Sequence, residues 1–343
     1  MNAVLQKHSG ETLDTRQRPL RDLRISVTDR CNFRCTYCMP KSVYDRNFKF
    51  LERSQLLSFD EINRLVGIFK EHGVEKIRIT GGEPLLRKQI EKLLEMISVN
   101  HDLDLTLTTN ATLLKQKAEI LKNSGLKRIT VSLDSLNDET FQIMNDMKVP
   151  VSTVLEGIEA ADKAGFSQIK VNMVVKGGVN DKDVLEMARY FKGSGHIIRF
   201  IEFMDVGSTN GWEMNRVIPS KALVEKINQV YPIEPVEPNY LGEVAERWKY
   251  TDGSGEIGFI SSVTQAFCGS CTRTRLSAEG SIYTCLFATA GTDLRMLLRT
   301  GASDKQISDV IKTIWNSRED NYSEIRTADT ASLKKIEMSY IGG

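Results

Sequence analysis

The six cysteines of the chain form two groups of three, and no cysteine lies outside them. The first group has the spacing C-x3-C-x2-C and the second has the spacing C-x2-C-x13-C. Closely spaced thiolates are typical ligands of metal ions and iron–sulfur clusters. A closed tetrahedral site needs four ligands, so each group leaves one position for a ligand other than cysteine. We therefore predict two metal centres that are open to small molecules, at Cys31, Cys35, Cys38, Cys268, Cys271 and Cys285.

Disulfides and structural zinc are the alternative uses of these cysteines. The first twenty residues are polar and lack the apolar centre of a secretory signal, and no apolar run is long enough to span a bilayer. We therefore expect a cytoplasmic protein with reduced thiols, in which metal binding is favoured over disulfides. A zinc knuckle in the first group would need a fourth Cys or His, and the nearest histidines in sequence are His8 and His72.

The composition is that of an ordinary globular protein. Of the 343 residues, 27% are charged and 41% are hydrophobic, which allows one large domain or two. The formal net charge is only +1, so nothing in the overall charge favours nucleic acid or a membrane as a partner. Any anion site must come from a local cluster of Lys and Arg.

Short β-rich segments alternate with amphipathic segments through the first two thirds of the chain. In the stretch 59–72, for example, Ile62, Leu65, Val66 and Phe69 follow the helical spacing i, i+3, i+4, i+7. Six β-α units in series predict a parallel sheet with helices outside, curved like a barrel and with its chemistry at the carboxyl ends of the strands. The predicted strands are 23–28, 76–80, 104–109, 128–133, 169–175 and 197–202. The predicted helices are 59–72, 86–98, 113–123, 152–164 and 181–192.

The β-α alternation stops after about residue 210, where four prolines follow in a linker-like region. Short strands are expected at 255–263 and 281–286, with the second cysteine group in and around them. We predict an α/β protein, with an incomplete (β/α)6 TIM-type barrel and a C-terminal α+β extension that covers the barrel opening. The expected divisions are a flexible N-terminal arm at 1–20, the barrel at 21–210 and the extension at 211–343.

Other residues support the chemistry of the first cysteine group. Cys31 directly follows the first predicted strand, Tyr37 precedes the last cysteine, and the second strand runs into Gly81-Gly82-Glu83-Pro84. This pattern resembles the cluster loop of radical S-adenosylmethionine enzymes. The resemblance implies that the three cysteines hold a [4Fe-4S] cluster whose fourth iron binds S-adenosyl-L-methionine. It further implies cofactor contacts by Tyr37, Gly82, Ser132 and Met204.

Arginines accompany the second cysteine group in the string Cys-Gly-Ser-Cys-Thr-Arg-Thr-Arg. Arg273 and Arg275 point to the same face of an extended segment, and two guanidiniums beside thiolates suit an anionic or purine ligand. Other Lys and Arg residues lie on the predicted barrel strands, where inward-facing cations would be unstable without an anionic partner. A charged ligand inside the barrel would supply that partner.

From about Pro19 to Gly343 the chain resembles the GTP 3′,8-cyclase (MoaA) family of molybdenum cofactor biosynthesis. The segments that carry the resemblance include RDLRISVTDRCNFRCTYCMP, RITGGEP, RFIEFMDVG, CGSCTRTRLS and the terminal Gly342-Gly343. The resemblance implies a second [4Fe-4S] cluster on Cys268, Cys271 and Cys285, with its open iron on guanine. It implies catalytic roles for Arg273, Arg275, Gly342 and Gly343. Substrate contacts are expected at Arg24, Lys76, Arg78, Thr108, Lys170, Arg199, Arg273, Thr274 and Arg275.

The implied reaction is radical cyclisation of GTP to 3′,8-cyclo-7,8-dihydro-GTP. The resemblance also implies an electron donor such as flavodoxin or ferredoxin, a homodimer, and a downstream cyclic pyranopterin monophosphate synthase (MoaC). Two residues depart from the family pattern: Ala111 stands where Gly is usual, and Thr272 where Asn is frequent. Ala111 would destabilise its loop by roughly 1 kcal/mol if the backbone there is left-handed. A peptide-modifying radical enzyme and a structural zinc protein are the rival interpretations.

Overall fold

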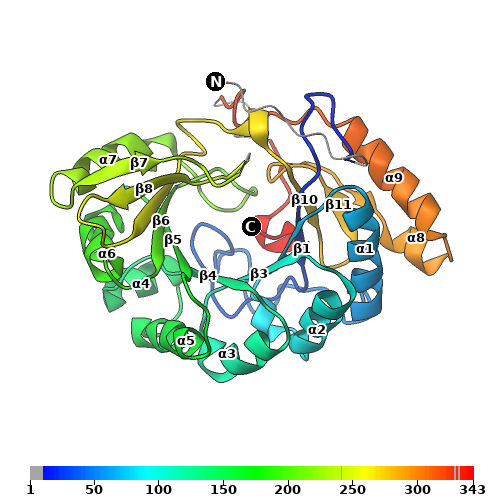
Figure 1. Cartoon of the computed structure of the whole chain (residues 1–343), viewed down its shortest axis with the longest axis horizontal. Helices are drawn as coiled ribbons and strands as arrows, with labels where there is room; N and C mark the ends of the chain where they lie inside the picture. Colours follow the sequence, from blue (N-terminus) through cyan, green and yellow to red (C-terminus); the bar gives the residue numbers. More distant parts are fainter. Residues whose placement is uncertain (1–10, 241, 328–329, 331–332) are drawn as a thin grey trace.

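The computed structural model describes residues 11–240, 242–327, 330 and 333–343. Its centre is six parallel strands that pair in chain order and curve into a partial ring, with helices on the outside (Figure 1). Three of the six predicted strands have the predicted bounds, and the others differ by a few residues. The strands are β1 (Asp22–Ser26), β2 (Lys76–Thr80), β3 (Asp104–Thr109), β4 (Arg128–Ser132), β5 (Lys170–Val175) and β6 (Ile197–Glu202).

Outer helices connect these strands, as the alternation predicted. Ser58 and Glu61 form a capping box at the start of the first helix, and Leu65 and Phe69 of the same helix are fully buried against the sheet. The second helix begins at Ile90 rather than at residue 86, and the fourth helix was not predicted. The helices are α1 (Phe59–Glu71), α2 (Ile90–Asn100), α3 (Leu114–Asn123), α4 (Asp138–Asn145), α5 (Val151–Lys163) and α6 (Val184–Phe191).

The C-terminal third of the chain lengthens the sheet at both edges. Strand β10 (Arg273–Leu276) pairs in parallel with β1, and β9 (Glu256–Ile260) pairs in parallel with β6. Antiparallel strands continue outward from each of them. The result is an α/β fold with a largely parallel sheet, consistent with a partial TIM barrel. The remaining elements are β7 (Ile233–Val236), β8 (Glu246–Tyr250), β11 (Ser281–Tyr283), β12 (Thr292–Asp293), α7 (Ser220–Asn228), α8 (Arg295–Arg299), α9 (Asp304–Asn316) and α11 (Met338–Ile341).

The segment before the first strand is packed against the rest of the protein. Asp14 forms ion pairs with Arg18 at 2.6 Å and with Arg318 at 3.1 Å, and all three side chains are buried. Leu20 is fully buried as well. The prediction of a flexible arm over residues 1–20 is therefore wrong for residues 11–20. Residues 1–10 lie outside the described part of the chain.

The two faces of the barrel strands differ sharply in polarity. Leu23 and Ile25 of β1 are fully buried against the outer helices, whereas Asp22 and Arg24 line the inside. Because side chains alternate along a strand, the polar residues of all the barrel strands gather in one interior space. The C-terminus lies in the middle of the ring of strands (Figure 1). No described helix combines the length and the apolar character needed to cross a bilayer.

Ala111 has the left-handed backbone under which the sequence predicts a strained loop. It follows β3 with φ +62°, is fully buried, and donates its N–H to Thr109 Oγ1 at 3.0 Å. A left-handed backbone is where glycine is favoured and alanine is strained.

Candidate active site

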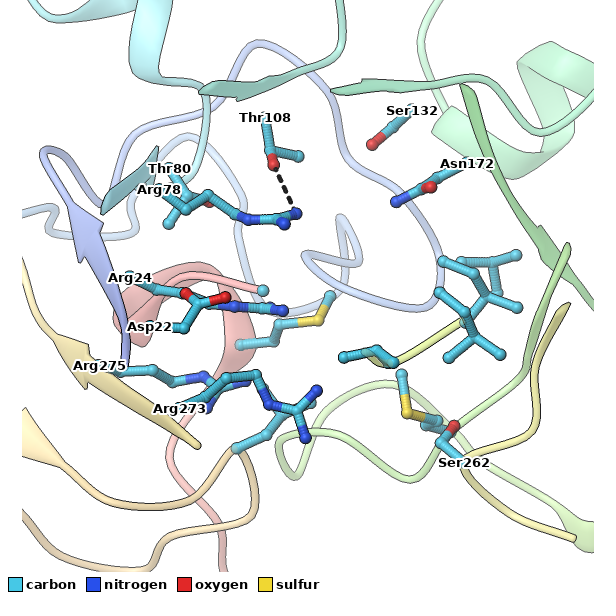
Figure 2. A pocket seen from close by; sticks show the side chains of 18 of the residues that line it. Asp22, Arg24, Arg78, Thr80, Thr108, Ser132, Asn172, Ser262, Arg273 and Arg275 are labelled. Atoms are coloured by element: carbon cyan, nitrogen blue, oxygen red, sulfur yellow. Dashed lines mark hydrogen bonds between the residues drawn. The ribbon is translucent and has the colours of Figure 1, made fainter. Parts of the chain in front are cut away.

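A cavity of about 440 Å³ lies inside the barrel, and all six cysteines line it. Its walls come from the inner face of the sheet and from residues of the C-terminal third. Figure 2 shows the side chains of Arg24, Arg78, Arg273 and Arg275 extending into this space, with Ser132 and Asn172 on the opposite strands. The two cysteine groups therefore open into one chamber.

The first cysteine group lies in the loop after β1. Burial raises the pKa of all three thiols, that of Cys31 to about 12, so the thiolates need a cationic partner in order to form. The Tyr37 hydroxyl donates to Asp134 Oδ2 at 2.8 Å, which fixes the loop to the end of β4. The Asp134 carboxylate also accepts the Val174 N–H at 2.9 Å. A metal centre is the partner that such buried thiols suit.

The Gly81-Gly82 turn after β2 packs directly against the loop of the first cysteine group. A Cβ on Gly82 would lie 2.3 Å from the Arg30 carbonyl oxygen, so no side chain fits there. Glu83 is buried, and its carboxylate accepts from Thr109 Oγ1 at 2.7 Å and from the Asn110 N–H at 2.7 Å. These bonds join the turn to the end of β3. Gly82 thus lines the cavity through its backbone, as predicted.

Three arginines stand side by side across neighbouring strands. Arg24 is in register with Arg275 on one side and Arg78 on the other. Burial and the two neighbouring guanidiniums lower the pKa of Arg24 well below its ordinary value. Nε of Arg24 and Nε of Arg78 are buried and have no hydrogen-bond partner among the described residues. Unpaired buried guanidinium donors indicate a site for an anion.

Two lysines and a further arginine continue this positive surface. Burial lowers the pKa of Lys76 to about 7 and that of Lys170 to about 7, with Arg78 and Arg199 respectively adding to the effect. Arg199 donates from Nε to Asn172 Oδ1 at 2.9 Å. Thr108 accepts from Arg78 Nη1 at 3.5 Å. All these residues line the cavity, so the structure brings together the cations predicted on the strands.

The second cysteine group is surrounded by arginines. Arg273 donates from Nη2 to Cys271 Sγ at 3.0 Å, and Arg318 donates to the Cys271 carbonyl oxygen at 2.8 Å. Burial alone would raise the pKa of Cys271, but the charges of Arg273 and Arg318 lower it to about 6. For Cys285, burial outweighs the opposing charge of Arg275 and raises the pKa to about 11. The Cys271 thiol is therefore ionised more easily than the Cys285 thiol.

One predicted substrate residue does not face the cavity. Thr274 is fully buried and donates from Oγ1 to the Tyr283 carbonyl oxygen at 3.0 Å. Arg273 and Arg275 point inward, so the residue between them points outward. The Thr274 side chain therefore turns away from the cavity, and the predicted substrate contact at this residue stays a prediction. Thr272 lines the cavity, and its carbonyl oxygen accepts from the Arg21 and Asp22 amides.

The C-terminal glycines reach the cavity. The Gly342 carbonyl oxygen accepts from Arg275 Nε at 3.2 Å, and Gly343 lines the cavity wall. Gly342 has φ +79°, and a Cβ there would lie 2.3 Å from Thr80 Cγ2. Backbone conformation and lack of space both require glycine at this position.

Several polar residues that line the cavity were not predicted, and four of them are Asp22, Asn172, Tyr240 and Glu243. Asp22 lies 3.5 Å from Lys76 Nζ and could have been found from its i, i+2 relation to Arg24. Asn172 has the same relation to Lys170 on β5. Tyr240 and Glu243 also line the cavity, but they come from the linker-like region, where the sequence gives no signal. Ser132 and Met204, predicted as cofactor contacts, do line the cavity.

Among the described residues, no three His, Cys, Asp or Glu side chains converge closely enough to bind a single metal ion. Three partly buried thiols on one loop, with an open chamber beside them, fit an iron–sulfur cluster that has an exchangeable ligand.

Comparisons with known proteins agree with this geometry. The model of the Radical SAM superfamily matches residues 25–191, and the model of Molybdenum Cofactor Synthesis C matches residues 196–324. A GTP 3′,8-cyclase of Acidothermus cellulolyticus is 49% identical, covering 96% of this chain and 98% of its own length. The chain belongs to the GTP 3′,8-cyclase family. A second relative, the GTP 3′,8-cyclase of Staphylococcus epidermidis, is 47% identical over the full length of both chains.

Solved structures of lower identity share the fold of this family member. Streptococcus suis SuiB bound to S-adenosylmethionine matches with a TM-score of 0.61 at 16% identity, covering 92% of this chain and 73% of that chain. Native anSMEcpe with bound AdoMet matches with a TM-score of 0.55 at 18% identity, covering 83% and 81%. These likenesses concern the fold alone. The family assignment replaces the zinc-protein and peptide-modifying interpretations.

Proposed function

We propose that this protein cyclises GTP to 3′,8-cyclo-7,8-dihydro-GTP by radical S-adenosylmethionine chemistry, the first step of molybdenum cofactor biosynthesis. The observation that carries the proposal is the single chamber shared by both cysteine groups, with unpaired guanidinium donors between them. A radical generated at the first cysteine group would therefore form in the same chamber as a substrate held at the second. GTP offers a purine for one end of the chamber and a triphosphate for the cations of the strands.

The cysteines are the proposed ligands of two [4Fe-4S] clusters, each completed by a small molecule. Cys31, Cys35 and Cys38 would hold the cluster that binds S-adenosyl-L-methionine, and the second group would hold the cluster that faces guanine. When bound, these groups would supply the electron that cleaves S-adenosyl-L-methionine to methionine and a 5′-deoxyadenosyl radical, which would take the C3′ hydrogen of GTP. Bonding of C3′ to guanine C8 would then be completed by a second electron from the electron donor and a proton.

The protein itself contributes binding, orientation and charge. Four residues that line the chamber with the first cysteine group are proposed to contact S-adenosyl-L-methionine: Tyr37, Gly82, Ser132 and Met204. GTP is proposed to bind to the polar hydroxyl of Thr108 and to five cationic side chains on the strands, those of Arg24, Lys76, Arg78, Lys170 and Arg199. Their convergent charges neutralise a triphosphate, and their strands hold it rigidly in place. Arg273 and Arg275 stand at the end of the second cysteine group and are proposed to orient the guanosine.

The finer architecture and the partners belong to the same proposal. Residues 21–210 would form an incomplete (β/α)6 barrel, and residues 211–343 an extension that covers its opening. Pairing of β9 and β10 with the outer barrel strands and the shared cavity wall support this division. By family resemblance we include cytoplasmic localisation, a homodimer, flavodoxin or ferredoxin as electron donor, and transfer of the product to cyclic pyranopterin monophosphate synthase (MoaC).

Anaerobic reconstitution with iron and sulfide tests the proposal. We expect about eight irons per chain with matching sulfide, the content of two [4Fe-4S] clusters. With S-adenosyl-L-methionine and dithionite, 5′-deoxyadenosine should then form in a GTP-dependent manner. A protein that keeps zinc after this treatment, or that forms 5′-deoxyadenosine equally without GTP, would contradict the proposal.

A further inference from the structure

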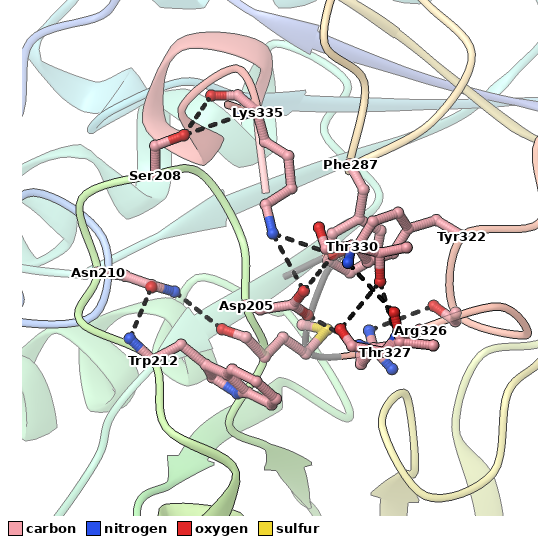
Figure 3. Close-up of polar contacts among 12 residues, drawn as sticks. Asp205, Ser208, Asn210, Trp212, Phe287, Tyr322, Arg326, Thr327, Thr330 and Lys335 are labelled. Atoms are coloured by element: carbon pink, nitrogen blue, oxygen red, sulfur yellow. Dashed lines mark hydrogen bonds and ion pairs between the residues drawn. The ribbon is translucent and has the colours of Figure 1, made fainter. Parts of the chain in front are cut away.

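A short segment ahead of the C-terminal tail is fastened to the loop after β6. We call residues 335–337 the anchor and residues 205–209 the receiver loop. Lys335 Nζ lies 3.1 Å from Asp205 Oδ2 and 3.1 Å from the Tyr322 hydroxyl, and Arg326 Nε lies 2.9 Å from Asp205 Oδ1 (Figure 3). The side chains of Lys335, Asp205 and Arg326 are almost entirely buried. A buried ion pair of this kind needs its partners in one fixed geometry.

Ser208 fixes the main chain of the anchor. Its Oγ accepts from the Lys335 N–H at 2.9 Å and donates to the Lys335 carbonyl oxygen at 3.1 Å (Figure 3). One hydroxyl thus satisfies both main-chain groups of one residue. The anchor therefore cannot shift along the receiver loop without losing two hydrogen bonds.

The Glu337 carboxylate fits into the receiver loop itself. Its Oε1 accepts from the Ser208 N–H at 3.0 Å, and its Oε2 accepts from Thr209 Oγ1 at 3.0 Å. Gly207 makes this approach possible, because it has φ +66° and a Cβ there would lie 2.2 Å from Glu337 Oε2. The loop backbone is shaped around the carboxylate.

The anchor leads directly into the tail. Helix α11 begins after Glu337, and the amides of Tyr340 and Gly342 donate to the carbonyls of Glu337 and Met338 at 3.0 Å and 2.9 Å. One turn of helix, a rise of about 6 Å, separates the anchor from Gly342. The receiver loop in turn follows Met204, which lines the cavity. The loop that carries a proposed cofactor contact therefore also sets the position of the tail.

We propose that Glu337, together with Lys335, is a positioning residue that holds Gly342 and Gly343 in the active site before substrate binds. This inference rests on the proposed function for its catalytic consequence. Loss of the anchor would free the tail from Arg275. S-adenosyl-L-methionine would still be cleaved, but cyclisation of GTP would fall behind cleavage.

Two substitutions break the anchor from opposite sides. Glu337→Ala removes the carboxylate, and Gly207→Ala places a methyl group where the carboxylate sits. Gly211→Ala is a matched control for Gly207→Ala, because Gly211 also has positive φ (+59°) but has no atom within 4 Å of an added Cβ. Glu119→Ala, on the exposed face of α3, is the control for Glu337→Ala. Glu337→Gln keeps an acceptor for the Ser208 N–H and should restore most of the wild-type behaviour.

The first readout is hydrogen exchange of the C-terminal peptide, which requires no turnover. Exchange at residues 340–342 should accelerate at least tenfold in Glu337→Ala and in Gly207→Ala, and should remain as in wild type in both controls. The second readout is the ratio of cyclised product to 5′-deoxyadenosine in the reconstituted enzyme. That ratio should fall at least tenfold in the two anchor variants, with the iron content unchanged.

The two readouts separate failure of this inference from failure of the proposed function. If wild-type protein forms no cyclised product, the proposed function fails. Hydrogen exchange at residues 340–342 still tests whether the anchor holds the tail. Unchanged exchange in Glu337→Ala overturns the inference. Faster exchange with an unchanged product ratio overturns the catalytic part of it. If Gly207→Ala does not fold, Glu337→Ala and its control decide alone.

Discussion

Binding of GTP should take up protons from solution, because two lysines in the proposed triphosphate site are largely neutral at alkaline pH when the site holds no anion. Burial and neighbouring cations lower the pKa of Lys76 and of Lys170 to about 7. A bound triphosphate supplies the missing negative charge and should return both pKa values toward the ordinary 10.5. The lysines are then charged in the complex between pH 7 and 10, but not in the free protein.

The size of the effect follows from these values. A lysine with a pKa of about 7 is roughly 90% protonated at pH 6 and roughly 10% protonated at pH 8. This tenfold fall in the charged form weakens the free energy of GTP binding by about 1.4 kcal/mol per lysine. Two lysines that titrate independently give up to about a hundredfold weaker GTP binding at pH 8 than at pH 6. GTP binding is strongest below pH 7 and weakens as pH rises, because the two lysines have a higher pKa in the complex than in the free protein. Proton uptake at pH 8 should approach about 1.8 per GTP bound.

Anaerobic titration calorimetry on the reconstituted protein, without reductant or S-adenosyl-L-methionine, measures both quantities. Titrations in buffers of different ionisation enthalpy give the number of protons taken up. The γ-phosphate of GTP also titrates near this range, so the control is Lys76→Arg with Lys170→Arg, which keeps the charge at all these pH values. The pH dependence of this variant should be much flatter. Equal proton uptake by wild type and variant at pH 8 would refute the assignment of these lysines.

Three further predictions concern Ala111, the two C-terminal glycines and Tyr37. Ala111→Gly should raise the free energy of unfolding by up to about 1 kcal/mol in urea titrations, because it relieves a left-handed alanine; a less stable variant would show that the strain is absent. Deleting Gly342 and Gly343 should abolish cyclisation while both clusters remain, as measured by product and iron analysis, and full activity of the truncated protein would contradict a role for the tail. Tyr37→Phe should destabilise the protein by about 1–3 kcal/mol in denaturant titrations, because Asp134 then loses a buried donor; an unchanged midpoint would mean that Asp134 finds another partner.

The barrel was predictable from the sequence because its signals are local. Each strand of the barrel is followed by an amphipathic helix, and the periodicity of 3.6 residues in α1 is visible without any tertiary information. The cysteine spacings are also local, and they identified two metal-binding groups, which the structure shows to open into one chamber. The cations of the strands could be anticipated because a charge on a buried strand needs a partner.

The edges of the sheet and the packing of residues 11–20 were not predictable in the same way. Strand β10 joins β1 from the far end of the chain, and Asp14 meets Arg318 over a similar separation. No short-range pattern records such contacts. Helix α4 was missed because it is short and directly precedes α5.

The outward direction of the Thr274 side chain was not predicted for a different reason. The family match treated Arg273, Thr274 and Arg275 as one motif, whereas strand geometry turns the middle side chain away from its neighbours. The same alternation rule would have identified Asp22 and Asn172 as residues that share the inward face with Arg24 and Lys170. Strand periodicity was the better guide to which side chains reach the cavity.

The fate of the hydrogen at C3′ of GTP tests the central claim most directly. The reconstituted protein is incubated anaerobically with S-adenosyl-L-methionine, dithionite and GTP deuterated at C3′, and the 5′-deoxyadenosine is analysed by mass spectrometry. We predict that 5′-deoxyadenosine carries one deuterium and forms together with the cyclised nucleotide. Unlabelled 5′-deoxyadenosine, accompanied by GTP that keeps its deuterium, would contradict the proposed reaction.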